Sequence, residues 1–363
     1  MKILFNTMTL GKGGAERVIN ILSNNFSNTN DVMIITNINS NIDYVFNKNI
    51  TIKSIAKKEN KIIRKINRIS IIKILNLKKE IIKFSPDIII SFLPEPSFRV
   101  LLLKKYSSKI KKIPMIVSVR NDPKTEYKNP LFYFVMKKLY PLATRLVLQT
   151  EDAKKYFKNT INIDGIVIAN PVDDTFIEKM YDGIREKIIV AVGRLEPQKN
   201  YKMLIDAFEI VSKTHKDYKL KIYGDGNLKN KIENYIHSKN LENKIILMGK
   251  VNNIKEEIFK ATAFVMSSNY EGMPNSLLEA ACLGLPCIST NCPCGGPNEI
   301  LNKGKNGILI NVNDFTELAN KINFIIENPQ IAKRYGENSN NDAYKYSSKA
   351  VINKWMKIID ELK

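Results

Sequence analysis

Residues 267–279 read SSNYEGMPNSLLE and follow the apolar run Ala263–Met266. A short apolar run that ends in a polar turn is typical of a buried strand, and the apolar segment Ser276–Leu283 after the turn predicts a helix. Strand, glycine-containing turn and helix form the repeating unit of a doubly wound parallel sheet. The turn places Glu271 eight residues before Glu279. A carboxylate at a strand end, backbone amides at a helix start and a second carboxylate one turn into the helix can hold a polyhydroxylated, phosphorylated ligand.

The same residues allow a purely structural interpretation. Ser276 and Glu279 have the spacing of a capping box, in which the two side chains satisfy the first amides of a helix. Glu271 and Gly272 have the composition of an exposed turn. The segment alone leaves both interpretations open, and the rest of the chain decides between them.

The first half of the chain alternates short apolar runs with longer periodic segments. This alternation predicts βαβ units and a parallel sheet. The predicted strands of this half are Lys2–Asn6, Val32–Thr36, Ile50–Ile55, Asp87–Phe92, Met115–Val119, Arg145–Gln149 and Ile166–Ala169.

The same alternation restarts after a break at residues 170–185. The predicted strands here are Ile188–Val192, Lys219–Tyr223, Ile245–Met248, Ala263–Met266, Pro286–Ser289 and Gly307–Ile310. The predicted fold class is therefore α/β, with Rossmann-like domains at 1–175 and 176–345 facing across a cleft, where ligands of such sheets bind. Residues 346–363 are predicted to form a C-terminal helix, with the single Trp355, that packs back on the first domain.

Two turns at predicted strand ends have the composition of phosphate-binding sites. After the first strand come Gly11, Gly13 and Gly14, although the G-x-G-G-A-E pattern does not match the dinucleotide fingerprint. After Val192 come Gly193, Arg194 and, five residues later, Lys199, whose two cations suit a diphosphate. A tight turn and solvated surface cations are the respective structural alternatives. Further strand-end turns follow at Gly224–Gly226 and Gly249–Val251.

Taken together, these motifs resemble those of the retaining GT-B glycosyltransferases of family 4, the group 1 glycosyl transferases that build O-antigen, capsule and other lipid-linked glycans in bacteria. The resemblance covers nearly the whole chain. The motifs that carry it are Gly13–Glu16, Val192–Lys199, Gly224–Gly226 and, most specifically, Glu271–Glu279.

The resemblance implies a role for each matching residue. Arg194 and Lys199 would bind and stabilise the donor diphosphate, and Glu271 would contact the donor sugar, which makes these three the candidate catalytic residues. Glu279 would hold the ribose, Gly14 would approach the phosphate from the first domain, and the Lys250–Val251 turn would border the base. The implied donor-binding set is Gly13, Gly14, Gly193, Arg194, Lys199, Gly224, Lys250, Val251, Glu271, Gly272, Met273, Pro274, Asn275, Ser276, Leu277 and Glu279.

The chain departs from the family pattern in the loop after the fifth strand. Many relatives carry a histidine there, whereas this loop reads Val119-Arg120-Asn121-Asp122-Pro123. Arg120 or Asn121 would take a neighbouring role beside the donor sugar. The sequence contains no D-x-D motif, which suits a metal-independent site built on Arg and Lys. The four cysteines between Cys282 and Cys294 lack zinc spacing, so we expect neither a metal nor a cofactor.

Basic residues concentrate in the first half of the chain. Residues 1–175 hold 30 Lys and Arg against 14 Asp and Glu, whereas residues 176–363 hold 27 against 22. The stretch Ile55–Phe84 has isoleucines at roughly helical spacing among ten basic and two acidic residues. Such a stretch is attracted to anionic lipid, although a solvated helix packed on a sheet explains it equally well. Nucleic acid is a weaker alternative, because no known binding module is recognised.

The expected function is transfer of a hexose or N-acetylhexosamine from a nucleotide sugar, UDP-linked rather than GDP-linked, to a lipid-linked undecaprenyl diphosphate glycan. The N-terminus lacks the long apolar region and cleavage site of a signal peptide, so we expect a cytoplasmic enzyme peripheral to the inner face of the membrane. The alternatives are a nucleotide-sugar epimerase or another GT-B enzyme, and a basic nucleic-acid-binding protein. The chain contains only two histidines, which argues against an epimerase, because such enzymes rely on a histidine in the cleft.

Overall fold

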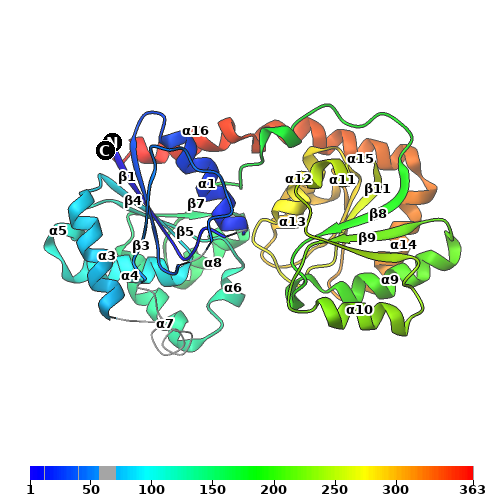
Figure 1. Ribbon diagram of the computed structural model, residues 1–363, viewed down its shortest axis with the longest axis horizontal. Helices are drawn as coiled ribbons and strands as arrows, with labels where there is room; N and C mark the ends of the chain where they lie inside the picture. Colours follow the sequence, from blue (N-terminus) through cyan, green and yellow to red (C-terminus); the bar gives the residue numbers. More distant parts are fainter. Residues whose placement is uncertain (12, 40, 57–70, 363) are drawn as a thin grey trace. The chain divides into compact units, whose positions relative to one another are not determined.

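The computed structural model describes residues 1–11, 13–39, 41–56 and 71–362. The chain divides into two compact units, Met1–Pro171 with Val351–Lys363, and Val172–Ala350. Each unit, taken by itself, is a parallel β-sheet with helices on both faces (Figure 1). The α/β class that the sequence predicts is therefore confirmed.

The first sheet has the strand order β3-β2-β1-β4-β5-β6-β7, with every neighbouring pair parallel. The chain order reverses at β1, which is the topological switch point of a doubly wound sheet. All residues of the central strand β4 are buried, as expected for a strand covered on both faces. The strands are β1 (Lys2–Thr7), β2 (Asp31–Thr36), β3 (Thr51–Ser54), β4 (Ile88–Phe92), β5 (Met115–Ser118), β6 (Arg145–Leu148) and β7 (Ile166–Val167).

The C-terminal helix completes the core of the first unit. Val351, Trp355, Ile358 and Ile359 are spaced to share one helical face, and they join the buried cluster of this sheet. The ring of Trp355 stacks 6.3 Å from that of Phe92. The helices of this unit are α1 (Gly14–Phe26), α3 (Ile71–Phe84), α4 (Pro94–Tyr106), α5 (Ser108–Lys111), α6 (Pro123–Glu126), α7 (Pro130–Leu139), the 3-10 turn η1 (Tyr140–Leu142), α8 (Glu151–Ile161) and α16 (Ser348–Asp360).

The second sheet repeats the doubly wound plan in the order β10-β9-β8-β11-β12-β13, again all parallel. Its strands are β8 (Glu186–Val192), β9 (Lys219–Tyr223), β10 (Ile245–Gly249), β11 (Ala261–Met266), β12 (Cys287–Thr290) and β13 (Ile308–Ile310). Its α-helices are α9 (Tyr201–Thr214), α10 (Lys229–Ser238), α11 (Ile254–Ile258), α12 (Asn275–Cys282), α13 (Gly296–Ile300), α14 (Phe315–Glu327) and α15 (Pro329–Asp342). Its 3-10 turns are η2 (Asp174–Phe176), η3 (Pro197–Lys199), η4 (Asn302–Gly304) and η5 (Ala343–Tyr346).

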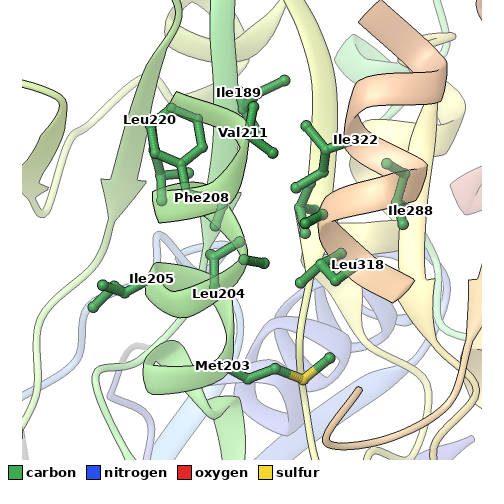
Figure 2. Packing of buried hydrophobic residues seen from close by; sticks show 14 of the residues in the cluster. Ile189, Met203, Leu204, Ile205, Phe208, Val211, Leu220, Ile288, Leu318 and Ile322 are labelled. Atoms are coloured by element: carbon green, nitrogen blue, oxygen red, sulfur yellow. The ribbon is translucent and has the colours of Figure 1, made fainter. Parts of the chain in front are cut away.

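Two amphipathic helices cover one face of the second sheet. Leu204 and Phe208 of α9 and Leu318 and Ile322 of α14 belong to one buried cluster, and Figure 2 shows these side chains close to the strands. All four side chains are fully buried. Burial of side chains of this size stabilises the fold by roughly 1.5–3 kcal/mol each. This packing fixes where α9 begins, and therefore where the turn before it lies.

The structure describes only part of the basic stretch predicted at 55–84, because residues 57–70 lie outside the described ranges. The described part, α3, buries Leu77, Ile81 and Phe84 against the unit. Within the described residues, no helix combines the length and the apolar character that crossing a membrane would require.

Candidate active site

Three loops of the second unit meet at the carboxyl edge of its sheet. They follow β8, β9 and β11, and β8 lies between the other two strands. The amide of Gly193, just after β8, donates to the carbonyl of Tyr223 at the end of β9 at 2.9 Å. Gly224 has a φ of +135°, and a Cβ there would lie 2.0 Å from the carbonyl oxygen of Gly193. The glycine is therefore required for these two turns to pack together.

The turn after β8 carries Lys199 into a defined position. Asn200 adopts the left-handed conformation with φ 47° and caps α9 through its side chain. The hydroxyl of Tyr201 donates back to the carbonyl of Gly193 at 3.0 Å. Both ends of the turn are thus tied, which limits the positions open to the lysine between them.

Lys199 and Glu271 form a nearly buried ion pair. The Nζ of Lys199 lies 2.6 Å from Oε1 of Glu271, and the two side chains are 13% and 9% exposed. The hydroxyl of Ser268 donates to the same carboxylate oxygen at 2.8 Å. A lysine and a serine from different loops therefore orient one carboxylate.

A ladder of polar contacts joins the β8–α9 turn to the β11–α12 loop. The side chain of Gln198 donates to the carbonyl of Tyr270 at 2.9 Å, and the amide of Asn269 donates to the carbonyl of Gln198 at 2.8 Å. The amide group of Asn200 donates to both Asn269 and Asn313, at 3.0 and 2.9 Å. The ladder holds the loop that carries Glu271 against the loop that carries Lys199.

The backbone of the β11–α12 loop is fixed from its other side by the turn after β12. The amide of Glu271 donates to the carbonyl of Pro293 at 2.6 Å, and the amide of Cys294 donates to the carbonyl of Glu271 at 2.8 Å. A Cβ on Gly296 would lie 1.8 Å from the carbonyl oxygen of Gly272. Sequence reasoning missed this support and missed Ser268, although Ser268 lies only three residues before Glu271.

The alternative interpretation of Ser276 and Glu279 as a capping box at the start of α12 is wrong. The helix begins at Asn275 with Pro274 as its N-cap, and no side chain accepts a capping hydrogen bond there. Ser276 therefore lies inside the helix, and Glu279 comes two positions after the one from which a capping box reaches back. Glu279 lies on the buried face of α12 and is only 5% exposed. Met273 is buried as well.

Arg194 differs sharply from Lys199 in its surroundings. Its side chain is 64% exposed, and its Nη1 lies 3.1 Å from Oε1 of Glu196. An exposed pair of this kind holds the side chain weakly. The arginine is thus placed at the strand end by its backbone but is free to rotate toward a ligand.

The outer turns of this edge follow β9 and β10. The amide of Leu195 donates to the carbonyl of Asp225 at 3.0 Å, and a Cβ on Gly226 would lie 2.6 Å from the oxygen of Leu195. Gly249, which ends β10, has a φ of +67°. Lys250 behind it is exposed and Val251 is half-buried.

The candidate glycines of the first unit lie where β1 leads into α1. Gly13 is the N-cap and Gly14 the first residue of the helix. The carbonyl of Gly13 accepts a hydrogen bond from Tyr44 at 3.1 Å, and Glu16 accepts one from Thr9 at 2.9 Å. This helix start therefore faces a polar cluster within its own unit.

The guanidinium of Arg120 is stacked inside the first unit. Its Cζ lies 5.0 Å from the ring centre of Phe92 and 5.6 Å from that of Trp355, and its Nη1 donates to Asn170 at 2.8 Å. The residue is only half-buried as a whole, but Nε and Nη2 are buried without a hydrogen-bond partner in the described part of the chain. Burial lowers the pKa of Arg120 to about 9. Asn121, in contrast, is half-buried and accepts from the next amide at 2.9 Å.

The four cysteines are free thiols and all are buried. Burial raises the pKa of Cys282 and Cys292 to about 12, so these thiols stay protonated at neutral pH. Within the described ranges, no group of three or more His, Cys, Asp and Glu side chains is arranged to hold a metal ion. These cysteines therefore pack as small apolar residues.

The segment that contains the whole Lys199–Glu271 loop pair has known relatives. Residues 174–342 match the family described as "Glycosyl transferases group 1". This part of the chain is therefore similar to the group 1 glycosyl transferases. The matched segment spans nearly all of the second unit, so it includes every candidate residue that follows β8, β9, β10 and β11.

Individual glycosyltransferases resemble the chain over different lengths. It is 25% identical over 369 residues, 100% of this chain and 99% of the relative, to the alpha-1,4-N-acetyl-D-galactosaminyltransferase of Campylobacter jejuni named for GalNAc-alpha-(1->4)-GalNAc-alpha-(1->3)-diNAcBac-PP-undecaprenol. It is 34% identical over 249 residues, 63% of this chain, to an uncharacterized glycosyltransferase of Methanocaldococcus jannaschii. The match spans 60% of that archaeal relative's length.

A solved structure resembles the chain in fold over nearly its whole length. Staphylococcus aureus TarM, in complex with Fondaparinux, alpha-GlcNAc-glycerol and UDP, matches with a TM-score of 0.79 at 17% identity, covering 98% of this chain and 99% of that one. A likeness at this identity concerns the fold. Together with the two parallel sheets, it confirms the GT-B class predicted from the sequence.

Proposed function

We propose that this chain is a retaining, metal-independent glycosyltransferase. It moves a hexose or an N-acetylhexosamine from a nucleotide sugar, UDP-linked rather than GDP-linked, to a lipid-linked glycan during synthesis of a surface polysaccharide such as O-antigen or capsule. The family match supports the transferase class. The name of the Campylobacter relative, which contains PP-undecaprenol, supports the lipid diphosphate acceptor, and the UDP bound to TarM supports the base.

The single observation that carries the proposal is the placement of Lys199 against Glu271 at the carboxyl edge of the second sheet. This edge is where doubly wound sheets bind nucleotides. A cation and a carboxylate that orient each other suit a ligand with a diphosphate next to a polyhydroxylated ring. The diphosphate competes with Glu271 for Lys199, and the released carboxylate accepts hydrogen bonds from sugar hydroxyls.

In the proposed reaction, the bond between the anomeric carbon and the diphosphate oxygen breaks as the acceptor oxygen attacks from the same face. The acceptor hydroxyl proton passes to the departing phosphate oxygen. Negative charge develops on the diphosphate, and Arg194 and Lys199 stabilise it together with the backbone amides of residues 272–277. Glu279 holds the ribose hydroxyls. Gly14 approaches the phosphate, and the Lys250–Val251 turn borders the base.

A panel of UDP- and GDP-sugars tests the proposal through protection against thermal unfolding. We expect one UDP-sugar to raise the midpoint and to be slowly hydrolysed to UDP, with or without EDTA. Proton NMR of the transfer product should show the same anomeric configuration as the donor. Absence of protection and of hydrolysis across the whole panel would overturn the transferase assignment.

The acceptor side of the proposal concerns the first unit. The excess of basic residues in 1–175 attracts an anionic, membrane-held substrate, so we propose that the protein works at the inner face of the cytoplasmic membrane. A lipid diphosphate glycan should accept sugar more efficiently in anionic vesicles than in neutral detergent. Equal rates in the two would contradict this part of the proposal.

A further inference from the structure

Helix α7 of the first unit begins at a fixed point. The side chain of Asn129 accepts from the amides of Leu131 and Phe132, at 2.9 and 3.3 Å, and Pro130 occupies the first helical position. An Asn cap followed by proline is a strong start signal for a helix. The helix therefore presents a defined set of side chains on each face.

The inner face of α7 is anchored on the unit. Met136 and Leu139 are buried. The ring of Phe132 packs edge-on against Phe98 of α4, with centroids 5.7 Å apart. These contacts hold the helix in place, so its outer face is a rigid surface.

The outer face of α7 is strongly apolar. Leu131 is 63% exposed and Phe134, one turn further, is 58% exposed. Tyr133 beside them is 37% exposed. Single exposed apolar residues are ordinary, but three on a ten-residue helix form a patch.

Lysines of α7 and of the residue before it border the patch. Lys137 and Lys138 lie on the same helix, with their Nζ atoms 5.5 Å from the ring centre of Tyr133 and 5.8 Å from that of Phe134. Lys128 just before the helix is also exposed. The sequence of α7, PLFYFVMKKL, contains no acidic residue. Apolar and aromatic side chains among lysines are the composition of a helix that lies in a membrane interface.

We propose that α7 docks into the headgroup region of an anionic lipid bilayer, with Leu131 and Phe134 inserted and Lys128, Lys137 and Lys138 contacting lipid phosphates. The inference deepens the proposed function, on which it rests for its biological role, by naming the surface that contacts the acceptor's membrane. A second copy of the chain is the less suitable occupant. A symmetric interface would set the lysines of one α7 against those of the other.

The test uses full-length protein and vesicles of phosphatidylglycerol mixed with phosphatidylcholine, with pure phosphatidylcholine as the neutral reference. Trp355 is the sole tryptophan and is fully buried, so a Phe134→Trp variant adds one exposed reporter. We expect its emission to shift to the blue and to be quenched by brominated lipid, with anionic vesicles only. Unshifted emission on bound vesicles would overturn the proposal.

Sedimentation with the same vesicles measures affinity. The double variant Leu131→Asn with Phe134→Asn should reduce vesicle binding at least tenfold, and Lys137→Gln with Lys138→Gln should do the same. Ile184→Asn is the matched control, because Ile184 is 95% exposed in the second unit and should leave binding unchanged. If both double variants bind vesicles as well as the wild type, the proposal is overturned. It is also overturned if the wild type is a dimer and the Leu131/Phe134 double variant is a monomer.

Donor hydrolysis separates this inference from the proposed function. The α7 variants should hydrolyse the donor at the wild-type rate, because their substitutions lie outside the second unit. If the α7 variants hydrolyse the donor normally and still bind vesicles like the wild type, only the α7 inference is overturned. If the wild-type protein binds vesicles but hydrolyses no donor, the proposed function is overturned instead.

Discussion

The Nζ of Lys199 lies 2.6 Å from Oε1 of Glu271, although 72 positions separate the two residues in the chain. Both side chains are almost buried, so each neutralises a charge that the fold has taken out of water. The pair therefore does two things at once. It stabilises the contact between two loops. It also holds a cation and a carboxylate in position at the place where we propose that the donor binds.

Breaking this pair should affect stability and activity together. Lys199→Met leaves the carboxylate of Glu271 without its cation, which should destabilise the protein by about 3 kcal/mol and lower transfer by roughly 10²–10³-fold. Adding Glu271→Gln should recover most of the stability, because no uncompensated charge remains, but none of the activity. Urea unfolding and donor turnover measure the two effects. Recovery of turnover in the double variant would show that the pair is structural only.

Replacing Arg194 should lower activity while leaving stability almost unchanged. Its side chain is exposed and paired with Glu196, so Arg194→Ala should change the free energy of unfolding by less than about 0.5 kcal/mol. Transfer should nevertheless fall by roughly 10²–10³-fold if the guanidinium stabilises the leaving diphosphate. Glu196→Gln provides the control, since it removes the pairing partner but keeps the cation. Near-normal turnover of Arg194→Ala at saturating donor would exclude the proposed role.

Much of the fold could be predicted because buried strands are short apolar runs between turn residues. Ile88–Phe92, for example, is a continuous apolar and β-branched segment, and all of it is buried. The strand-end position of Glu271 could be predicted for the same reason. The glycine turns after β8 and β9 could be predicted equally well, because each glycine directly follows an apolar run in the sequence.

The supporting contacts of the site could not be predicted, because they join residues that are distant in sequence. Asn200 reaches Asn313, and Ser268 orients Glu271, but isolated polar residues leave no periodic pattern. The stacking of Arg120 on Trp355 has the same origin. A loop motif can thus indicate which residues face a ligand, whereas the residues that hold them in place emerge only from the folded chain.

The close packing of the β8 and β9 turns predicts unequal tolerance of two glycines. Gly224→Ala should destabilise the protein by more than about 3 kcal/mol, because its Cβ would overlap the carbonyl of Gly193 in addition to requiring a φ of +135°. Gly249→Ala has the strained φ of +67° but nothing within 4 Å of the new Cβ, so it should cost about 1–2 kcal/mol. Thermal unfolding of both variants compares them. Equal losses would mean that the two turns separate easily.

Glu126 of α6 should make stability depend on pH. Its Oε2 is buried without a hydrogen-bond partner in the described ranges. Burial, and secondarily the carboxylate of Asp122, raises the pKa of Glu126 to about 7. The residue as a whole is partly exposed, but the buried oxygen decides the energy of the charged form. The folded protein therefore favours the protonated acid.

Because this folded-state pKa lies above the ordinary value of about 4.5, the contribution of Glu126 to stability is complete below about pH 4.5. It is lost as the pH rises through 7. Glu126→Gln keeps the shape without the charge, so it should be close to wild type at pH 4.5 and more stable by roughly 3 kcal/mol at pH 8. Urea unfolding of both proteins across this range measures the difference. Curves that stay parallel from pH 4.5 to 8 would show that the carboxylate of Glu126 reaches water when it ionises.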